Sequence, residues 1–225
     1  MKARVLYVPL FIAAEADRLA ALAGDWAEVA SFDVPVEAPV EAAHARLDEL
    51  GWDECVLVAD GYAQGLGTEI ALSHPDRFLA VAVGHAAKRF TTEPPRPTLH
   101  PEVVAAARQL LETDYMAFWR AVTQITQGGM PDAWVERWAT SVPKERARAV
   151  FSGITDSEAP AAERLAEFEG PLLLAQHTDC VLWTAEGFED IVSAMPHARV
   201  VRCDQIPVFD AAFGDVLREL AAVRP

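Results

Sequence analysis

The sequence predicts an α/β fold in which a parallel sheet is flanked by helices and interrupted by a helical insertion. Two observations carry this prediction. Short runs of apolar residues alternate with amphipathic segments towards both ends of the chain, and the residues between them have helical spacing without a strand-like apolar run. Runs that are apolar throughout are typical of parallel strands, because helices cover both faces of such a sheet.

The N-terminal part of the chain predicts strands and helices in alternation. The strands are apolar runs at 4–8, 28–32, 54–59 and 78–83. The helices have apolar residues three or four positions apart, at 13–24, 40–50 and 68–73. Gly51 directly follows the second of these helices, as is typical of a helix C-terminus.

A proline-rich stretch at 91–101 separates this part from a segment with only helical signals, which extends to residue 169. The alternation then resumes with a strand at 171–175, a helix at 185–195, a strand at 199–203 and a helix at 211–223. The chain is therefore predicted to form a core domain from 1–90 and 170–225 and a helical insertion at 91–169.

Aromatic and apolar side chains in the insertion follow a helical spacing: Tyr115, Phe118, Trp119, Val122, Trp134 and Trp138. Such a stripe is typical of packing inside a helical domain. It is also the pattern of a helical cap whose inner face lines a pocket. The two interpretations are compatible, and the sequence leaves both open.

Composition and charge disfavour several kinds of partner. The 19 Lys and Arg residues against 34 Asp and Glu residues give a net charge of −15, which argues against nucleic acid and anionic membrane surfaces. No apolar run is long enough for a transmembrane helix, and the N-terminus lacks the features of a secretory signal. Cys55, Cys180 and Cys203 form no C-x-x-C pair, which favours a reducing compartment. We therefore expect a cytoplasmic protein.

Cofactor and metal motifs are not recognisable in the sequence. No G-x-G-x-x-G motif or phosphate-binding loop follows a predicted strand, and no spacing of His, Asp, Glu or Cys matches a metal site. We therefore expect neither a cofactor nor a metal ion, and the partner that remains is a small-molecule substrate. The sequence leaves a homodimer open.

The most informative motif lies between a predicted strand and a predicted helix, at GYAQG (61–65). This is the strand–turn–helix context of the G-x-S-x-G motif. The chain resembles the α/β-hydrolase family over nearly its whole length: QHTD (176–179) resembles the turn with the catalytic acid, CDQIP (203–207) the turn with the histidine, and the insertion the cap. The resemblance implies an α/β-hydrolase-like sheet with a helical cap and without the family's first two strands.

Several positions depart from the family's pattern. Ala63 stands at the position of the nucleophile, and a methyl group cannot attack a carbonyl. Gln205 stands at the position of the histidine, and an amide cannot accept a proton at neutral pH. Of the three triad positions, only the one occupied by Asp179 therefore matches the family. Outside the triad, Pro9 and Leu10 replace the family's His-Gly pair before the oxyanion loop. The resemblance therefore implies the fold and not the hydrolytic chemistry.

Asp60, His85 and Asp179 are the candidates for acid–base catalysis. Asp60 ends an apolar strand just before the turn, and His85 follows the next strand, so both are predicted at the edge of a pocket. Each also has a structural alternative: a pair with an arginine or a backbone N–H for Asp60, a hydrogen-bonded structural imidazole for His85 and a relic contact for Asp179. The predicted substrate-binding residues are Phe11, Tyr62, Ala63, Gln64, Trp119 and Gln205.

The sequence supports three hypotheses about function. The favoured one is a cofactor-independent, non-hydrolytic enzyme of small-molecule biosynthesis, such as a cyclase, lyase or isomerase, that acts on a largely apolar substrate under the cap by general acid–base catalysis. The first alternative is a catalytically inactive pseudo-hydrolase that binds a ligand or a partner protein. The second is a serine hydrolase with an engineered serine-to-alanine substitution at Ala63.

Overall fold

The computed structural model of the chain describes residues 2–9, 16–35, 37–85, 101–127, 132–156, 164–178, 185–204, 207 and 210–222. Within these residues, parallel strands form one six-stranded sheet in the order β2-β1-β3-β4-β5-β6. The strands are β1 (Ala3–Val8), β2 (Ala27–Ala30), β3 (Cys55–Asp60), β4 (Phe78–Gly84), β5 (Leu172–His177) and β6 (Arg199–Cys203).

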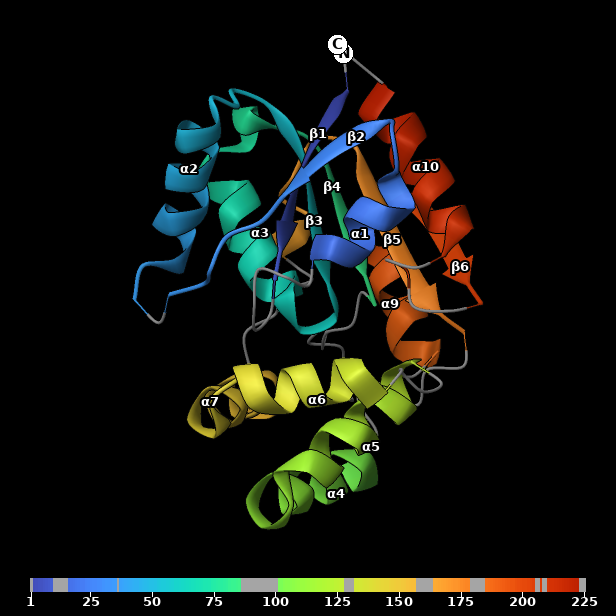
Figure 1. Cartoon of the computed structure of the whole chain (residues 1–225). Coiled ribbons are helices and arrows are strands. Elements are labelled where there is room, and N and C mark those ends of the chain that lie inside the picture. Colours follow the sequence, from blue (N-terminus) through green and yellow to red (C-terminus); the bar gives the residue numbers. More distant parts are fainter. Residues whose placement is uncertain are drawn as a thin grey trace.

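Helices cover both faces of the sheet, which explains why its strands are apolar along their length (Figure 1). Alternate strand residues point to opposite faces. Val56 and Val58 share a hydrophobic cluster with α1 and α10, whereas Leu57 and Ala59 share one with α2, α3 and α9. These helices are α1 (Ala16–Ala23), α2 (Pro39–Leu50), α3 (Gln64–Ser73), α9 (Ala185–Ala194) and α10 (Ala211–Ala222).

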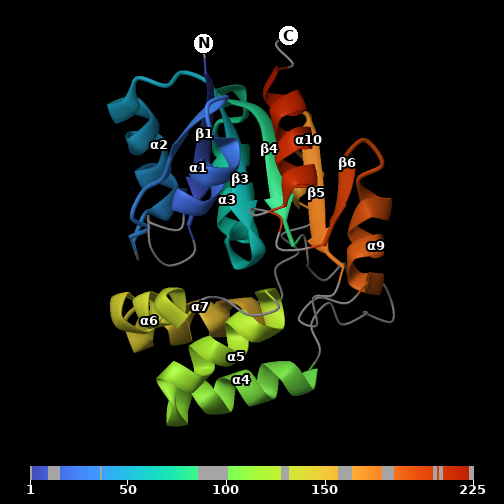
Figure 2. The same ribbon diagram turned by 45° about the vertical axis from the view of Figure 1, so that its right-hand side comes forward.

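A separate layer of helices lies beyond the carboxyl ends of the strands (Figure 2). It contains α4 (Pro101–Thr113), α5 (Tyr115–Gln127), α6 (Asp132–Ser141) and α7 (Lys144–Asp156). These helices bury their own hydrophobic cluster, which includes Trp119, Trp138 and Phe151. We call this layer the cap.

Polar contacts attach the cap to the sheet domain. The guanidinium of Arg18, in α1, lies 5.0 Å from the ring centroid of Trp138, in α6. Arg146, in α7, donates a hydrogen bond of 2.7 Å to the backbone oxygen of Val34. Because cation–π and charge-assisted contacts are directional, they set how the cap sits on the sheet edge.

The strands and helices that the structure describes begin and end within a few residues of their predicted limits. The main differences are that α3 begins at Gln64, and that β5 extends to His177. The predicted start of α3 was late because Gly65 and Gly67 weaken the helical signal of its first turn. Leu165 and Phe168 belong to the hydrophobic cluster of the sheet, although the predicted insertion included them.

The helices of the described residues are too short to cross a membrane. The longest of them, α4, α5 and α7, have 13 residues each. A span across the hydrocarbon core needs about 20 apolar residues.

Candidate active site

Polar side chains meet at the carboxyl ends of four neighbouring strands. Asp60 ends β3, His85 directly follows β4, His177 ends β5 and Cys203 ends β6. In the register of the sheet, Asp60 pairs with Gly84, and His177 pairs with Cys203. Open α/β sheets bind their ligands at this edge, and here the cap lies over it (Figure 1).

Asp60 and His85 form a hydrogen-bonded pair. Nδ1 of His85 lies 3.0 Å from Oδ1 of Asp60, and the two side chains are only 3% and 14% exposed, respectively. An ionised carboxylate can only accept, so Nδ1 carries the proton of this hydrogen bond. The carboxylate thereby fixes the tautomer and the orientation of the imidazole.

The backbone around Gly84 makes this pair feasible. A Cβ atom at Gly84 would lie 2.2 Å from Oδ1 of Asp60, so only glycine leaves room for the carboxylate. His85 has a φ of 49°, in the left-handed region that few residues other than glycine adopt. Such strained residues are concentrated at functional sites, where the surrounding structure holds them in place.

His177 is a further residue of the site, to which the sequence analysis assigned no role. Its ring centroid lies 6.4 Å from that of His85, with the two rings nearly perpendicular. The side chain is buried, and Nδ1 has no hydrogen-bond partner among the described residues. The signal that could have found it is the pair of polar residues, Gln176 and His177, that continues the apolar run of β5.

Carboxylates surround the end of β6. Burial, followed by the negative charges of Asp210, Asp60 and Asp204, raises the pKa of Cys203 to about 12. Asp210 accepts hydrogen bonds from the backbone N–H groups of Asp204, at 3.0 Å, and Ala212, at 2.8 Å, and so holds the start of α10 beside the site. The negative field makes Cys203 a poor nucleophile.

Alkylation measures this lack of reactivity. Burial also raises the pKa of Cys55 to about 12, and a thiol with such a pKa is ionised in about one molecule in ten thousand at pH 8. In a Cys180→Ser background, we expect iodoacetamide to leave the native protein unmodified and to modify Cys55 and Cys203 after unfolding in urea. Modification of Cys203 at the same rate in both states would contradict the assignment.

The turn after β3 has the predicted strand–turn–helix arrangement. Gly61–Ala63 forms a 3-10 turn, in which Gly61 has a φ of 54°, and α3 follows directly. Ala63 is 2% exposed and has a φ of −75° and a ψ of −7°, which is ordinary right-handed helical backbone. A nucleophile elbow instead holds its central residue in a strained conformation. Gln64 is buried at the start of α3.

Trp119 lies in the interior of the cap. It is 1% exposed, and its ring packs at 5.1 Å from Phe118 and 5.2 Å from Trp138, measured between centroids. Trp119, which the sequence analysis also predicted as a substrate-binding residue, therefore packs against the other aromatic rings of the cap. Phe11, Asp179, Gln205 and the side chain of Tyr62 lie outside the described residues.

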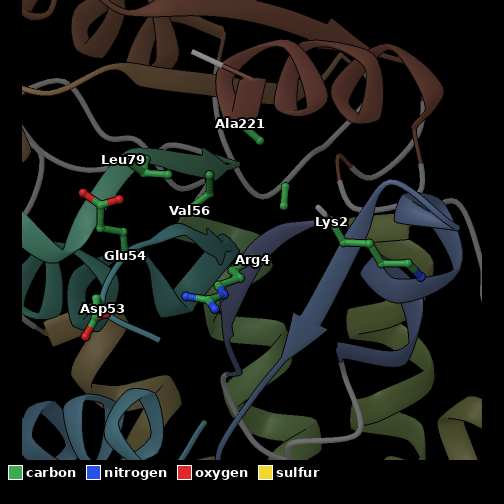
Figure 3. Close-up of a pocket in the computed structure, with 8 residues that line it drawn as sticks. Lys2, Arg4, Asp53, Glu54, Val56, Leu79 and Ala221 are labelled. Carbon is green, nitrogen blue, oxygen red and sulfur yellow. The ribbon is translucent and has the colours of Figure 1, made fainter. Parts of the chain in front are cut away.

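A pocket lies at the edge of the sheet opposite the candidate active site (Figure 3). Its volume is about 220 Å³, and Lys2, Arg4, Asp53 and Glu54 contribute charged groups to its lining. These residues lie at the amino ends of β1 and β3, whereas Asp60 and His85 lie at the carboxyl ends. This pocket is therefore separate from the candidate active site. The described residues contain no group of three or more His, Cys, Asp or Glu side chains placed to hold a metal ion.

Comparison with known proteins identifies the fold. No protein-family model and no curated protein matches the chain. Among solved structures, a hydrolase from Oleispira antarctica matches with a TM-score of 0.79 and 11% identity over 99% of this chain and 92% of that chain. The esterase RhEst1 from a Rhodococcus species matches with a TM-score of 0.76 and 13% identity over 98% and 90%. The chain has the α/β-hydrolase fold.

A third solved structure that is similar to this α/β-hydrolase-fold protein is a 2-hydroxy-6-oxo-6-phenylhexa-2,4-dienoate hydrolase from a Rhodococcus species. Its TM-score is 0.73, with 14% identity over 99% of this chain and 91% of that chain. The predicted fold class, a parallel sheet flanked by helices as in α/β-hydrolase-fold proteins, is thus confirmed. At such low identities the likeness concerns the fold alone, so the chemistry has to be argued from this protein's own side chains.

Proposed function

We propose that this α/β-hydrolase-fold protein is a cofactor-independent, non-hydrolytic enzyme that transfers protons within a small, largely apolar molecule bound under the cap. The buried hydrogen bond of 3.0 Å between Asp60 and His85 is the observation that carries the proposal. The pair reproduces the carboxylate–imidazole half of a catalytic triad without a nucleophile.

The pair supplies the chemistry of a general base followed by a general acid. Nε2 of His85 takes a proton from a C–H or O–H group of the substrate, and Asp60 stabilises the imidazolium that forms. The same nitrogen returns the proton to another atom of the substrate or to a leaving group. This sequence of steps is the chemistry of an isomerase, a lyase or a cyclase.

The residues at the hydrolytic positions favour a reaction without an acyl-enzyme. Ala63 offers only a methyl group, and Gln205 an amide, where the family resemblance places the nucleophile and the base. A single engineered substitution at Ala63 would leave Gln205 and Pro9 unexplained. The same set of departures supports a second candidate, a non-catalytic binding protein, since loss of selection on chemistry lets each position change.

A promiscuous probe tests the proposal before the substrate is known. In nitrobenzisoxazole, a base removes the proton on the ring carbon, the N–O bond breaks, and a coloured cyanonitrophenolate forms. We expect the protein to accelerate this elimination and His85→Gln to lower the rate by about 100-fold or more. Asp60→Asn should also lower the rate, because the amide no longer stabilises the imidazolium.

His197→Asn is the matched control, because His197 is exposed in the turn before β6 and should not affect the rate. A wild-type rate no higher than that of His85→Gln would refute the proposal and favour the binding protein. A fluorophosphonate probe should not label the chain. Labelling of any serine would instead identify a serine hydrolase.

A further inference from the structure

A second cluster of histidines joins α2 to the end of α3, away from the candidate active site. Nε2 of His44, in α2, lies 2.7 Å from Oγ of Ser73 and 3.2 Å from Nδ1 of His74. The rings of His44 and His74 lie 4.2 Å apart between centroids. His44 is buried, whereas Ser73 and His74 lie at the surface. The cluster connects two segments that are distant in the sequence, because His44 and Ser73 are 29 positions apart.

The hydrogen bonds fix the protonation states of both rings. The hydroxyl of Ser73 donates to the backbone oxygen of Ile70 at 2.8 Å, so its oxygen accepts from Nε2–H of His44. Nδ1 of His74 faces the same N–H at 3.2 Å and must therefore act as an acceptor, without a proton. This arrangement requires both imidazoles to be neutral.

Protonation of either ring disrupts the arrangement. A proton on Nδ1 of His74 would place two N–H donors against each other. A proton on Nδ1 of His44 would be buried without an acceptor, since this atom has no hydrogen-bond partner among the described residues. A buried donor or charge without a partner destabilises the folded state.

The charges around His44 add to this effect. Arg77, which precedes β4, acts on His44 from one side, and Phe78 packs against its ring at 6.0 Å between centroids. Arg77 is itself held by a hydrogen bond of 2.9 Å to the backbone oxygen of Trp52 and by an ion pair of 2.8 Å with Asp48. Asp48, in α2, and the backbone oxygen of Ile70 act in the opposite direction on His44 and offset part of the effect of Arg77 and His74.

We propose that His44, Ser73 and His74 form an acid-sensitive clasp, which holds α2 against α3 while the imidazole of His44 is neutral and releases α2 when His44 becomes protonated. The clasp lies at the end of α3, whereas the helix begins at the turn after Asp60. This inference does not depend on the proposed enzymatic function, because it concerns the packing of two helices.

The direction of the pH dependence follows from His44. Burial, followed by His74 and Arg77, lowers the pKa of His44 from its usual value of 6.5. The unfolded segment therefore binds more protons than the folded one as the pH falls below about 6.5, and the stability of the clasp decreases in that range. Above this range both states are neutral at this site, and the clasp keeps its full stability.

Hydrogen–deuterium exchange of the full chain tests the clasp. The amide exchange rates are compared at about pH 8 and about pH 5, a range in which histidine changes its charge. EDTA is present in both samples, and the rates are corrected for the pH dependence of intrinsic exchange. We expect the amides of 40–50 and 70–74 to exchange several-fold faster in acid, because the opened segment binds protons that the closed segment excludes. The amides of β3 and β4 should keep their protection.

His44→Phe keeps a ring against Phe78 and removes the buried titrating group, so it should abolish the acid response of α2. If that variant does not fold, His74→Asn is decisive, because this exposed substitution removes the opposing imidazole and should weaken the response. His197→Asn, outside the clasp, should leave it unchanged. An acid response that is absent from the wild type, or equal in the wild type and the His44 and His74 variants, would overturn the proposal.

Discussion

Replacement of Trp119 by alanine should destabilise the protein by about 3–5 kcal/mol, the usual effect of deleting a buried aromatic ring. Trp119 is 1% exposed and packs with Tyr115, Phe118 and Trp138 in the hydrophobic cluster of the cap. The cavity left by its loss cannot collapse without moving two helices. Urea unfolding followed by circular dichroism measures the loss, and proteolysis should cleave the cap of Trp119→Ala first.

Trp119→Phe is the conservative control, because it keeps an aromatic ring at the same place and should cost much less. Trp119→Ala with a wild-type urea midpoint would show that the ring lines a pocket and does not support the cap.

Gly84→Ala should cost about 1–3 kcal/mol, as overpacking of a buried site does, and should break the contact between Asp60 and His85. The new Cβ would lie 2.2 Å from Oδ1 of Asp60 and 3.2 Å from Cβ of Pro207, so the carboxylate would have to move. Urea unfolding measures the cost, and the nitrogen-15 chemical shifts of His85 report the loss of its hydrogen bond. The elimination rate with nitrobenzisoxazole should decrease in parallel.

Gly214→Ala provides the matched control for the same chemical change. The atoms nearest to its Cβ would be those of the flexible Leu22 side chain, at 3.1 Å or more, and alanine is favourable inside α10. A double-mutant cycle gives a second check: in an Asp60→Ala background, Gly84→Ala should cost less, because the clashing carboxylate is absent. Equal costs in both backgrounds would contradict the contact.

The strands were predictable because both faces of the sheet are buried. Apolar runs such as those of β3 and β4 have no alternation, and few other structures have such a pattern. The limits of α3 were less predictable, because glycines in its first turn hide the helical signal. The packing of Leu165 and Phe168 on the sheet was not predictable, since periodicity does not tell which of two hydrophobic clusters a residue joins.

The places of Asp60 and His85 at the ends of neighbouring strands were predictable, whereas the contact between their side chains was not. Asp60 and His85 each stood out as a polar residue at the end of an apolar run. Their hydrogen bond depends on the pairing of Asp60 with Gly84 and on the space beside that glycine, which no sequence pattern encodes. The contact of His44 with Ser73 also depends on tertiary packing, because the residues are 29 positions apart on two different helices.

The backbone at Ala63 bears on what a serine at this position could do. Its φ of −75° and ψ of −7° continue the helical path into α3. A serine at this position would be carried on the first turn of a helix and not on the sharp bend that exposes a nucleophile. A serine introduced here would therefore supply a hydroxyl without the bend of a nucleophile elbow. Ester hydrolysis at this turn would require a different loop as well as different side chains.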